Sequence, residues 1–257
     1  MKSNHKNIYI GTVCLDPTRW GSRQPSLAVS DWLERFRGDG FDGVELWEFH
    51  FTAAGEAERD RLVAAATPLA IYNSYVGFAD DDAAARSIAV GAIARLRAQA
   101  VKYNLGPDAA KLGEYRRNLL AWAEQLPDSC RLLCECHPGT VLEKVDDAAA
   151  FFADLDPARF GVIVHVMGDA DGIKPWFAGL HGRIDHLHVQ MRDPGTDPTV
   201  PENRPPFDAC FDVVKAGGFQ GSATIEFSRG IGKDEDTETI YRNACADLAY
   251  CREALEC

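Results

Sequence analysis

The sequence predicts an α/β fold, a (β/α)8 TIM barrel of eight parallel strands surrounded by outer helices. The chain of 257 residues has the length typical of this fold. Apolar strand-like runs alternate with segments of helical periodicity from one end to the other. No linker or low-complexity tract interrupts this order, so we expect a single domain over residues 1–257.

Eight strand–helix pairs follow one another in the sequence. Short apolar runs bounded by turn residues predict strands at residues 8–14, 41–47, 68–75, 99–105, 130–136, 160–166, 184–190 and 221–227. Apolar residues at helical spacing predict helices at residues 25–38, 54–66, 80–97, 107–125, 143–154, 171–180, 206–216 and 234–255. An open doubly wound sheet is the alternative. It would normally carry a glycine-rich dinucleotide loop after the first strand, and residues 11–16 (GTVCLD) are not one.

The composition argues against several classes of partner. A formal net charge of −12 disfavours nucleic acid, because binding to a phosphate backbone depends on clustered Lys and Arg. No apolar run approaches the roughly 20 residues that span a bilayer, so we expect no membrane partner. Residues 1–7 are polar and do not resemble a signal peptide. Eight cysteines without an export signal indicate reduced thiols in the cytoplasm. The sequence leaves a homo-oligomer open.

The alternation of side chains along each strand indicates which of them face the barrel interior. In the eighth strand Ala223, Ile225 and Phe227 form an apolar row that should face the helices, so Glu226 points inward. The same reasoning places one ionisable residue inside the fifth, sixth and seventh strands: Glu135, His165 and His188.

Four successive strands thus carry an inward ionisable group near their C-terminal ends. A packed interior does not tolerate four unpaired polar groups, so they must pair with one another or with an ion. Two carboxylates and two imidazoles that converge at the C-terminal mouth predict a divalent-metal site with oxygen and nitrogen ligands.

Further side chains are candidates for substrate binding. His137 should point inward just above Glu135, and Glu45 and Trp47 share an inward face of the second strand. Lys102 and Asn104 alternate with apolar neighbours on the fourth strand. A core aromatic is the alternative for Trp47, and a structural role beside the Pro-Gly turn is the alternative for His137. His186, one pleat below His188, is interpreted as a hydrogen-bonded core histidine.

Two loop arginines are candidate contacts for an anionic substrate group. Arg192 follows the seventh strand, and Arg229 follows the eighth in the glycine-containing loop 228–233. Loops at these positions often form phosphate sites in barrels, and a solvated glycine loop is the alternative. Residues 192–206, rich in Pro, Asp and Gly, are long enough to act as a lid.

Five stretches carry a resemblance to a known family: residues 40–46 (GFDGVEL), 133–140 (LCECHPGT), 160–163 (FGVI), 184–188 (IDHLH) and 218–226 (GFQGSATIE). Together they are similar to the xylose-isomerase-like TIM barrel superfamily, which includes sugar and sugar-phosphate isomerases and epimerases. The resemblance extends from about residue 8 to residue 255. It supports the predicted fold.

The resemblance implies one divalent metal ion, with its ligands at Glu135, His165, His188 and Glu226. The family usually has Asp where this chain has His165, and Gln190 replaces a lysine that often follows the strand-seven histidine. Two imidazoles favour Mn, Zn, Fe or Co over Mg. Loss of the catalytic metal is the alternative.

The resemblance also implies the chemistry. In the family the metal holds two neighbouring oxygens of a hydroxy-carbonyl substrate, and Glu135 and Glu226 are the catalytic residues that move a proton at the adjacent carbon. The implied function is a metal-dependent isomerase or epimerase of a small sugar or related polyhydroxy carbonyl compound, acting through an enediolate. The alternatives are a lyase of the 3-dehydroshikimate-dehydratase kind and a non-catalytic ligand-binding barrel.

Overall fold

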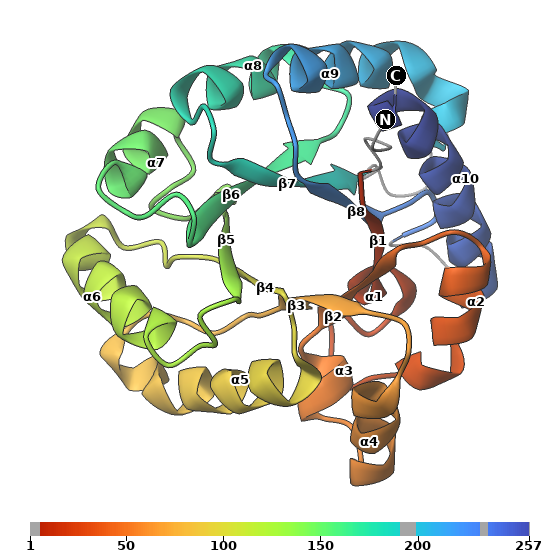
Figure 1. The fold of residues 1–257 in the computed structure, drawn as a ribbon, viewed down its shortest axis with the longest axis horizontal. Coiled ribbons are helices and arrows are strands. Elements are labelled where there is room, and N and C mark those ends of the chain that lie inside the picture. The colour runs from red at the N-terminus through yellow and green to blue at the C-terminus, as the bar shows by residue number, and fades with distance from the viewer. Residues whose placement is uncertain (1–5, 191–198, 232–235, 257) are drawn as a thin grey trace.

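The computed structural model describes residues 6–190, 199–231 and 236–256. Its eight strands form one closed parallel barrel in which β8 pairs with β1 (Figure 1), which confirms the predicted (β/α)8 fold. The strands are β1 (Ile8–Gly11), β2 (Gly43–Trp47), β3 (Leu69–Asn73), β4 (Ala100–Tyr103), β5 (Arg131–Glu135), β6 (Phe160–Val166), β7 (Ile184–Gln190) and β8 (Ser222–Phe227).

Helices surround the barrel on all sides (Figure 1). The longer ones are α2 (Leu33–Gly38), α4 (Glu56–Ala64), α5 (Ala83–Leu96), α6 (Leu112–Ala123), α7 (Val145–Phe152), α8 (Ala170–Gly179), α9 (Arg204–Ala216) and α10 (Thr237–Glu256). Single turns of α-helix form α1 (Thr12–Leu15) and α3 (Phe49–Thr52), and 3-10 turns form η1 (Val29–Asp31), η2 (Asp80–Asp82), η3 (Ala109–Lys111) and η4 (Val200–Asn203). None of the helices in the described ranges has the length and apolar character needed to cross a bilayer.

The first strand and the first helix are shorter than the sequence predicts. The strand expected at 8–14 ends at Gly11, where the chain turns into α1, and the helix expected at 25–38 is reduced to η1 and α2. Between α1 and η1 the chain forms a loop whose residues 16–26 are held by Asp16. Its carboxylate accepts hydrogen bonds from the backbone N–H groups of Thr18 (2.9 Å) and Ser26 (2.8 Å).

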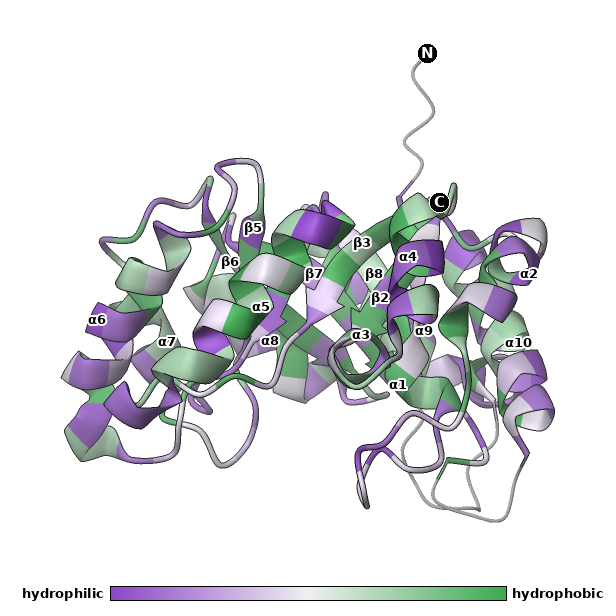
Figure 2. Ribbon diagram, turned by 90° about the horizontal axis from the view of Figure 1, so that it is seen from below, coloured by the Kyte–Doolittle hydropathy of each residue, from purple (hydrophilic) through white to green (hydrophobic). Residues whose placement is uncertain are grey.

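The core has two layers, one outside the strands and one inside them. Outward-facing residues such as Val162 and Val164 on β6 are buried against the helices, along which hydrophilic and hydrophobic residues alternate (Figure 2). A separate apolar cluster lies inside the barrel, formed by Tyr9, Ala70, Ile71, Ala100, Leu133 and Ile163.

The barrel interior changes from apolar to polar along the strands. On four strands in succession an apolar interior residue is followed, two places later, by a polar one: Asn73 after Ile71, Lys102 after Ala100, Glu135 after Leu133 and His165 after Ile163. The interior therefore has an apolar floor and a polar C-terminal mouth, which is the end at which barrel enzymes carry their chemistry.

An ion pair lies at the opposite, N-terminal end of the barrel. Nε of Arg131 donates a hydrogen bond to Oδ2 of Asp185 across the start of β6 (2.9 Å). Gly161 lies between them, and a Cβ atom at this position would lie only 1.8 Å from Oδ2 of Asp185. The absence of a side chain at residue 161 therefore lets Arg131 on β5 and Asp185 on β7 form their ion pair across β6.

Candidate active site

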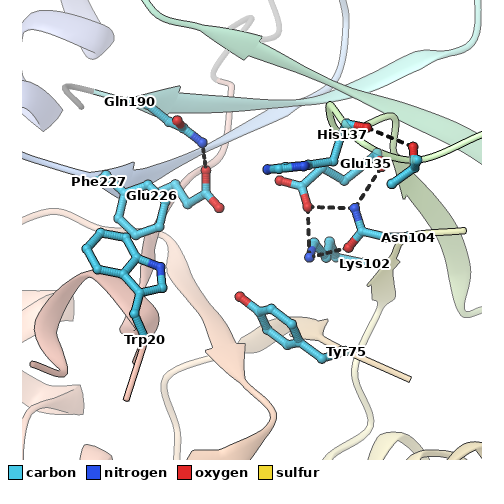
Figure 3. A pocket seen from close by; sticks show the side chains of 10 residues that line it. Trp20, Tyr75, Lys102, Asn104, Glu135, His137, Gln190, Glu226 and Phe227 are labelled. Carbon is cyan, nitrogen blue, oxygen red and sulfur yellow. Dashed lines mark hydrogen bonds and ion pairs between the residues drawn. The ribbon is translucent and has the colours of Figure 1, made fainter. Parts of the chain in front are cut away.

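A cavity of about 300 Å³ opens at the C-terminal mouth of the barrel (Figure 3). Charged and polar side chains from β4, β5, β7 and β8 form one part of its wall, and aromatic side chains form another. The lining residues are Trp20, Tyr75, Lys102, Asn104, Glu135, His137, Thr140, Gln190, Glu226 and Phe227.

The structure brings the four predicted metal ligands together at this mouth. Ligand atoms of Glu135, His165, His188 and Glu226 all lie within 4.8 Å of one another. Nε2 of His165 lies 2.8 Å from Oε1 of Glu135. Nδ1 of His188 lies 3.2 Å from the same oxygen and 3.1 Å from Oε2 of Glu226. The four residues come from the consecutive strands β5, β6, β7 and β8, so the pairing of neighbouring strands assembles the cluster.

The donor set fits a divalent ion. Zinc bonds to imidazole nitrogen and carboxylate oxygen are about 2.0–2.2 Å long, which places neighbouring ligand atoms roughly 3–3.5 Å apart. The contacts of His188 with Glu135 and Glu226 are already close to that separation. The amide oxygen of Gln190 is buried and has no hydrogen-bond partner in the described ranges, so the site also keeps an unused acceptor beside the cavity.

Burial and charge act in opposite directions on these groups. Burial alone would raise the pKa of Glu135, but Lys102, His165 and His188 outweigh it and lower that pKa well below its usual range. Burial alone would lower the pKa of His188, but Glu226 and Glu45 raise it well above its usual value. Positive charge near these carboxylates, from Lys102 or from a bound ion, therefore stabilises the cluster.

The two predicted catalytic carboxylates have different surroundings. Oε1 of Glu135 faces two histidines, and its Oε2 lies 2.8 Å from Nζ of Lys102 and accepts a hydrogen bond from Nδ2 of Asn104 (2.9 Å). Oε2 of Glu226 contacts Nε2 of Gln190 and Nδ1 of His188. No described residue donates a hydrogen bond to Oε1 of Glu226. One oxygen of Glu226 is thus open at the cavity, whereas both oxygens of Glu135 are engaged.

Three of the predicted substrate-binding residues line the cavity. Nζ of Lys102 contacts Oδ1 of Asn104 (2.7 Å) and lies over the ring of Tyr75, 4.4 Å from its centre. Asn104 also donates to the backbone oxygen of Glu135 (2.8 Å). Nδ1 of His137 lies 2.7 Å from the carbonyl oxygen of Pro138. That contact requires a proton on Nδ1, because the carbonyl oxygen can only accept.

Two further predicted residues, Glu45 and Trp47, do not reach the cavity. Glu45 is fully buried under His188, with its Oε2 3.2 Å from Nε2 of that ring. The ring of Trp47 is also buried and packs against Phe49 and His50, so the core-aromatic alternative describes it. Alternation placed Glu45 inward correctly, but it carries no information on how deep the side chain lies.

Of the two loop arginines, only Arg229 belongs to the described residues. Arg229 pairs with Glu202 of η4 at 3.2 Å and is not part of the cavity wall. Arg192 lies outside the described residues, as do 192–198 of the expected lid and Lys233. The described part of that lid, residues 199–206, forms η4 and the start of α9.

The aromatic wall of the cavity, formed by Trp20, Tyr75 and Phe227, was not predicted from the sequence. Trp20 lies in the loop held by Asp16 and packs against Phe227, with ring centres 5.7 Å apart (Figure 3). Phe227 was expected to face the helices, but it lines the cavity because the pairing of β7 with β8 shifts by one residue between Val189 and Gln190. Tyr75 and Thr140 follow β3 and β5 in loops, where no periodic pattern indicates direction.

No protein-family model matches the chain, and no curated protein matches its sequence. Solved structures match it over nearly its whole length. A D-psicose 3-epimerase in the presence of D-fructose is 16% identical, with a TM-score of 0.74 over 98% of this chain and 100% of that chain. The probable 3-DHS dehydratase AsbF from Bacillus anthracis is 14% identical, with a TM-score of 0.67 over 96% and 98%. The IolI protein with a binding zinc atom is 12% identical, with a TM-score of 0.65 over 97% and 98%. The chain therefore has the xylose isomerase-like TIM barrel fold, as the resemblance in its sequence predicts.

Proposed function

We propose that the protein is a divalent-metal-dependent isomerase or epimerase of a small sugar or related polyhydroxy carbonyl compound. The observation that carries the proposal is the convergence of Glu135, His165, His188 and Glu226 beside the mouth cavity. Two structures with the same fold are named D-psicose 3-epimerase and L-ribulose 3-epimerase, which supports a sugar-like substrate.

One divalent ion would be held by these four residues. Mn, Zn, Fe and Co are favoured over Mg because imidazole nitrogen suits the former ions, whereas Mg prefers oxygen ligands. The zinc in the IolI structure is in keeping with this preference. When bound, the ion supplies positive charge that stabilises the negative charge left on the substrate oxygens after a proton leaves carbon.

Glu226 is the better candidate for the base that removes this proton. Its Oε1 is open to the cavity, whereas Glu135 would have to leave Lys102 and Asn104 before it accepts a proton. In a two-base epimerisation Glu135 would act on the opposite face of the substrate. Because both oxygens of Glu135 are already engaged by other side chains, the site favours a reaction with one carboxylate base.

The cavity wall suits a molecule with both apolar and hydroxylated faces. Trp20, Tyr75 and Phe227 offer aromatic surface for the C–H face of a sugar. His137, Lys102 and Asn104 are the proposed contacts for its hydroxyl or carbonyl oxygens. A volume of about 300 Å³ lies at the small end of ligand pockets, which matches a single small molecule.

A lyase of the 3-dehydroshikimate-dehydratase kind is the second candidate. Such a reaction needs one base for proton removal before water is lost, and Glu226 is the one carboxylate of the pair with an open oxygen. The probable 3-DHS dehydratase AsbF has the same fold. The two candidates differ in substrate and product, so one set of assays separates them.

Metal content and proton exchange test the proposal together. Protein purified without chelator should carry about one Mn, Fe, Co or Zn ion per chain. D-fructose, D-psicose, L-ribulose and 3-dehydroshikimate are then incubated with it in deuterated water. We expect exchange of a C–H next to the carbonyl, with an isomer or a dehydrated acid as product.

The Glu226→Gln variant identifies the base. It keeps the shape of the side chain and one acceptor oxygen, and we expect exchange to fall by roughly 10²–10⁴-fold. Glu202→Gln, which alters an acid outside the cavity, is the control and should exchange normally. Unchanged exchange in Glu226→Gln would exclude that residue as the base. Protein that carries no metal and gains no thermal stability from any of these ions would favour the ligand-binding barrel instead.

A further inference from the structure

His188 lies between carboxylates on both sides of its ring. Nδ1 faces the cluster at the mouth, 3.2 Å from Oε1 of Glu135 and 3.1 Å from Oε2 of Glu226. Nε2 faces the barrel interior, 3.2 Å from Oε2 of Glu45. The ring itself is fully buried. The two nitrogens therefore have different environments, and only Nδ1 belongs to the group that converges at the cavity.

Donors surround the buried carboxylate of Glu45. Nδ2 of Asn73 donates to its Oε1 (2.7 Å), and the hydroxyl of Thr224 donates to its Oε2 (2.8 Å). Both oxygens of Glu45 thus accept hydrogen bonds, and Nε2 of His188, 3.2 Å from Oε2, is placed to donate a further one.

A second histidine sets the direction of the hydrogen bonds around Glu45. Because the Thr224 hydroxyl donates to Glu45, its oxygen accepts from Nε2 of His186 at 2.8 Å. Nδ1 of His186 then accepts from the hydroxyl of Ser222, also at 2.8 Å. Nε2 of His186 also lies 3.4 Å from Oε2 of Glu45, so the chain of hydrogen bonds ends at Glu45.

The cost of burying Glu45 indicates that it has a specific partner. Beyond the hydrogen-bonding partners of Glu45, interior side chains of the barrel such as Ile71 and Ile163 are apolar. Replacing a buried charged group by a well-packed hydrophobic residue is often neutral or stabilising, so packing does not account for a carboxylate at this place. The group formed by Glu45, His186 and His188 also has metal-binding residue types, but both oxygens of Glu45 already accept hydrogen bonds.

We infer that Glu45 is a positioning residue, which holds the proton of His188 on Nε2 and so directs an unprotonated Nδ1 to the ion at the mouth. The inference rests on the proposed function in one respect, namely that a divalent ion binds at this site. Carboxylates that hold the second nitrogen of a metal-bound histidine fix both its tautomer and its ring orientation. Glu45 is thereby reassigned from a substrate contact to the support of a ligand.

The matched variants are Glu45→Gln and Ile163→Val. Gln has nearly the same size as Glu, but its amide NH₂ would face one of the donors that now point at the carboxylate. Ile163→Val alters the same interior without touching Glu45. Zinc affinity is measured for each protein by competition with a chromogenic chelator. We expect it to fall about 10- to 100-fold in Glu45→Gln and to stay within about twofold of wild type in Ile163→Val.

A nuclear magnetic resonance measurement on the metal-free protein tests the positioning role without zinc. The Nε2 proton of His188 should be visible and protected from solvent in the wild type and lost or exchanging in Glu45→Gln. If Glu45→Gln does not fold, Thr224→Val removes one donor to Glu45 and should still weaken zinc binding severalfold.

The outcomes separate the two proposals. Wild type that binds no zinc would contradict the proposed metal site, whereas the Nε2 proton would still decide the role of Glu45. Equal zinc affinity in wild type and in the Glu45 or Thr224 variant would overturn the positioning role and leave the metal site intact. A His188 ring without a proton on Nε2 would overturn it as well.

Discussion

The ammonium group of Lys102 lies 2.8 Å from Oε2 of Glu135, and both side chains are almost fully buried at the barrel mouth. Glu135 therefore has its counter-ion within the protein before any ion binds. The pair explains why a carboxylate is tolerated at this depth, and it distinguishes Glu135 from Glu226, which contacts an amide and an imidazole instead.

Removing the cation should strongly destabilise the protein. In Lys102→Met the buried carboxylate of Glu135 loses its partner, and a broken buried pair typically costs about 3–5 kcal/mol in the free energy of unfolding. Urea unfolding of the metal-free protein measures this loss. The control is Arg117→Met, which breaks an exposed pair with Asp80 of the same 2.8 Å length and should cost less than about 1 kcal/mol. Equal losses in the two variants would show that the pair at the mouth contributes no more than a surface ion pair.

Replacing His165 should change which ion the site prefers. His165→Asp replaces the imidazole whose Nε2 lies 2.8 Å from Oε1 of Glu135 by a carboxylate, which adds a negative charge and a hard oxygen ligand. We expect the preference to move toward Mg or Mn at the expense of Zn. Competition between the ions, followed by elemental analysis of the washed protein, measures the change. An unaltered Zn-to-Mg ratio would place His165 outside the set of ligands.

A buried acid on α10 should make stability depend on pH. Burial raises the pKa of Asp247 to about 7, although its carboxylate accepts hydrogen bonds from Ser228 (2.5 Å) and the backbone of Val200 (2.8 Å). The folded state then holds a proton that the unfolded chain releases near pH 4. The contribution of Asp247 to the free energy of unfolding should therefore be at its full value below about pH 4. Between pH 4 and pH 7 it should fall by up to roughly 1.4 kcal/mol for each pH unit.

The Asp247→Asn variant isolates this contribution. Asn resembles the protonated acid and does not titrate, so its stability should change less than that of the wild type between pH 5 and pH 8. Urea unfolding at several pH values in that range gives the difference curve. A constant difference between the two proteins at all pH values would show that Asp247 does not titrate in this range.

The loop that carries Trp20 should loosen when Asp16 is changed. Asp16 is fully buried and accepts hydrogen bonds from Thr18, Ser26 and Nε2 of His50 (3.0 Å). Asn at this position offers one acceptor oxygen and turns an NH₂ group toward these donors. We expect Asp16→Asn to make the exposed bond after Arg23 several times more sensitive to trypsin.

Limited proteolysis of the metal-free protein, with the fragments identified by mass, measures this effect. Asp108→Asn, which changes an exposed acid at the start of η3 that accepts from the N–H of Ala110, is the control and should leave cleavage after Arg23 unchanged. If cleavage there does not increase in Asp16→Asn, the loop owes its conformation to other contacts.

The strand order and the direction of the key side chains could be predicted from the sequence alone. Alternation with a period of two residues is a local property of each strand, so one segment at a time sufficed to place Glu135, His165, His188 and Glu226 inside. The same local patterns predicted the eight strand–helix pairs and hence the closed barrel.

The tertiary structure decided how deep each side chain lies in the barrel and which residues it contacts. Alternation predicts that both Glu45 and Lys102 point inward, yet Glu45 lies under His188 and Lys102 lines the cavity. The difference comes from the register between neighbouring strands, which sets the height of each residue in the barrel and is not encoded in any single strand. The register shift between β7 and β8 directs Phe227 to the barrel mouth. Trp20, which packs against Phe227, lies in a loop without a periodic pattern. Each of these arrangements depends on contacts between segments far apart in the chain, which a local pattern does not contain.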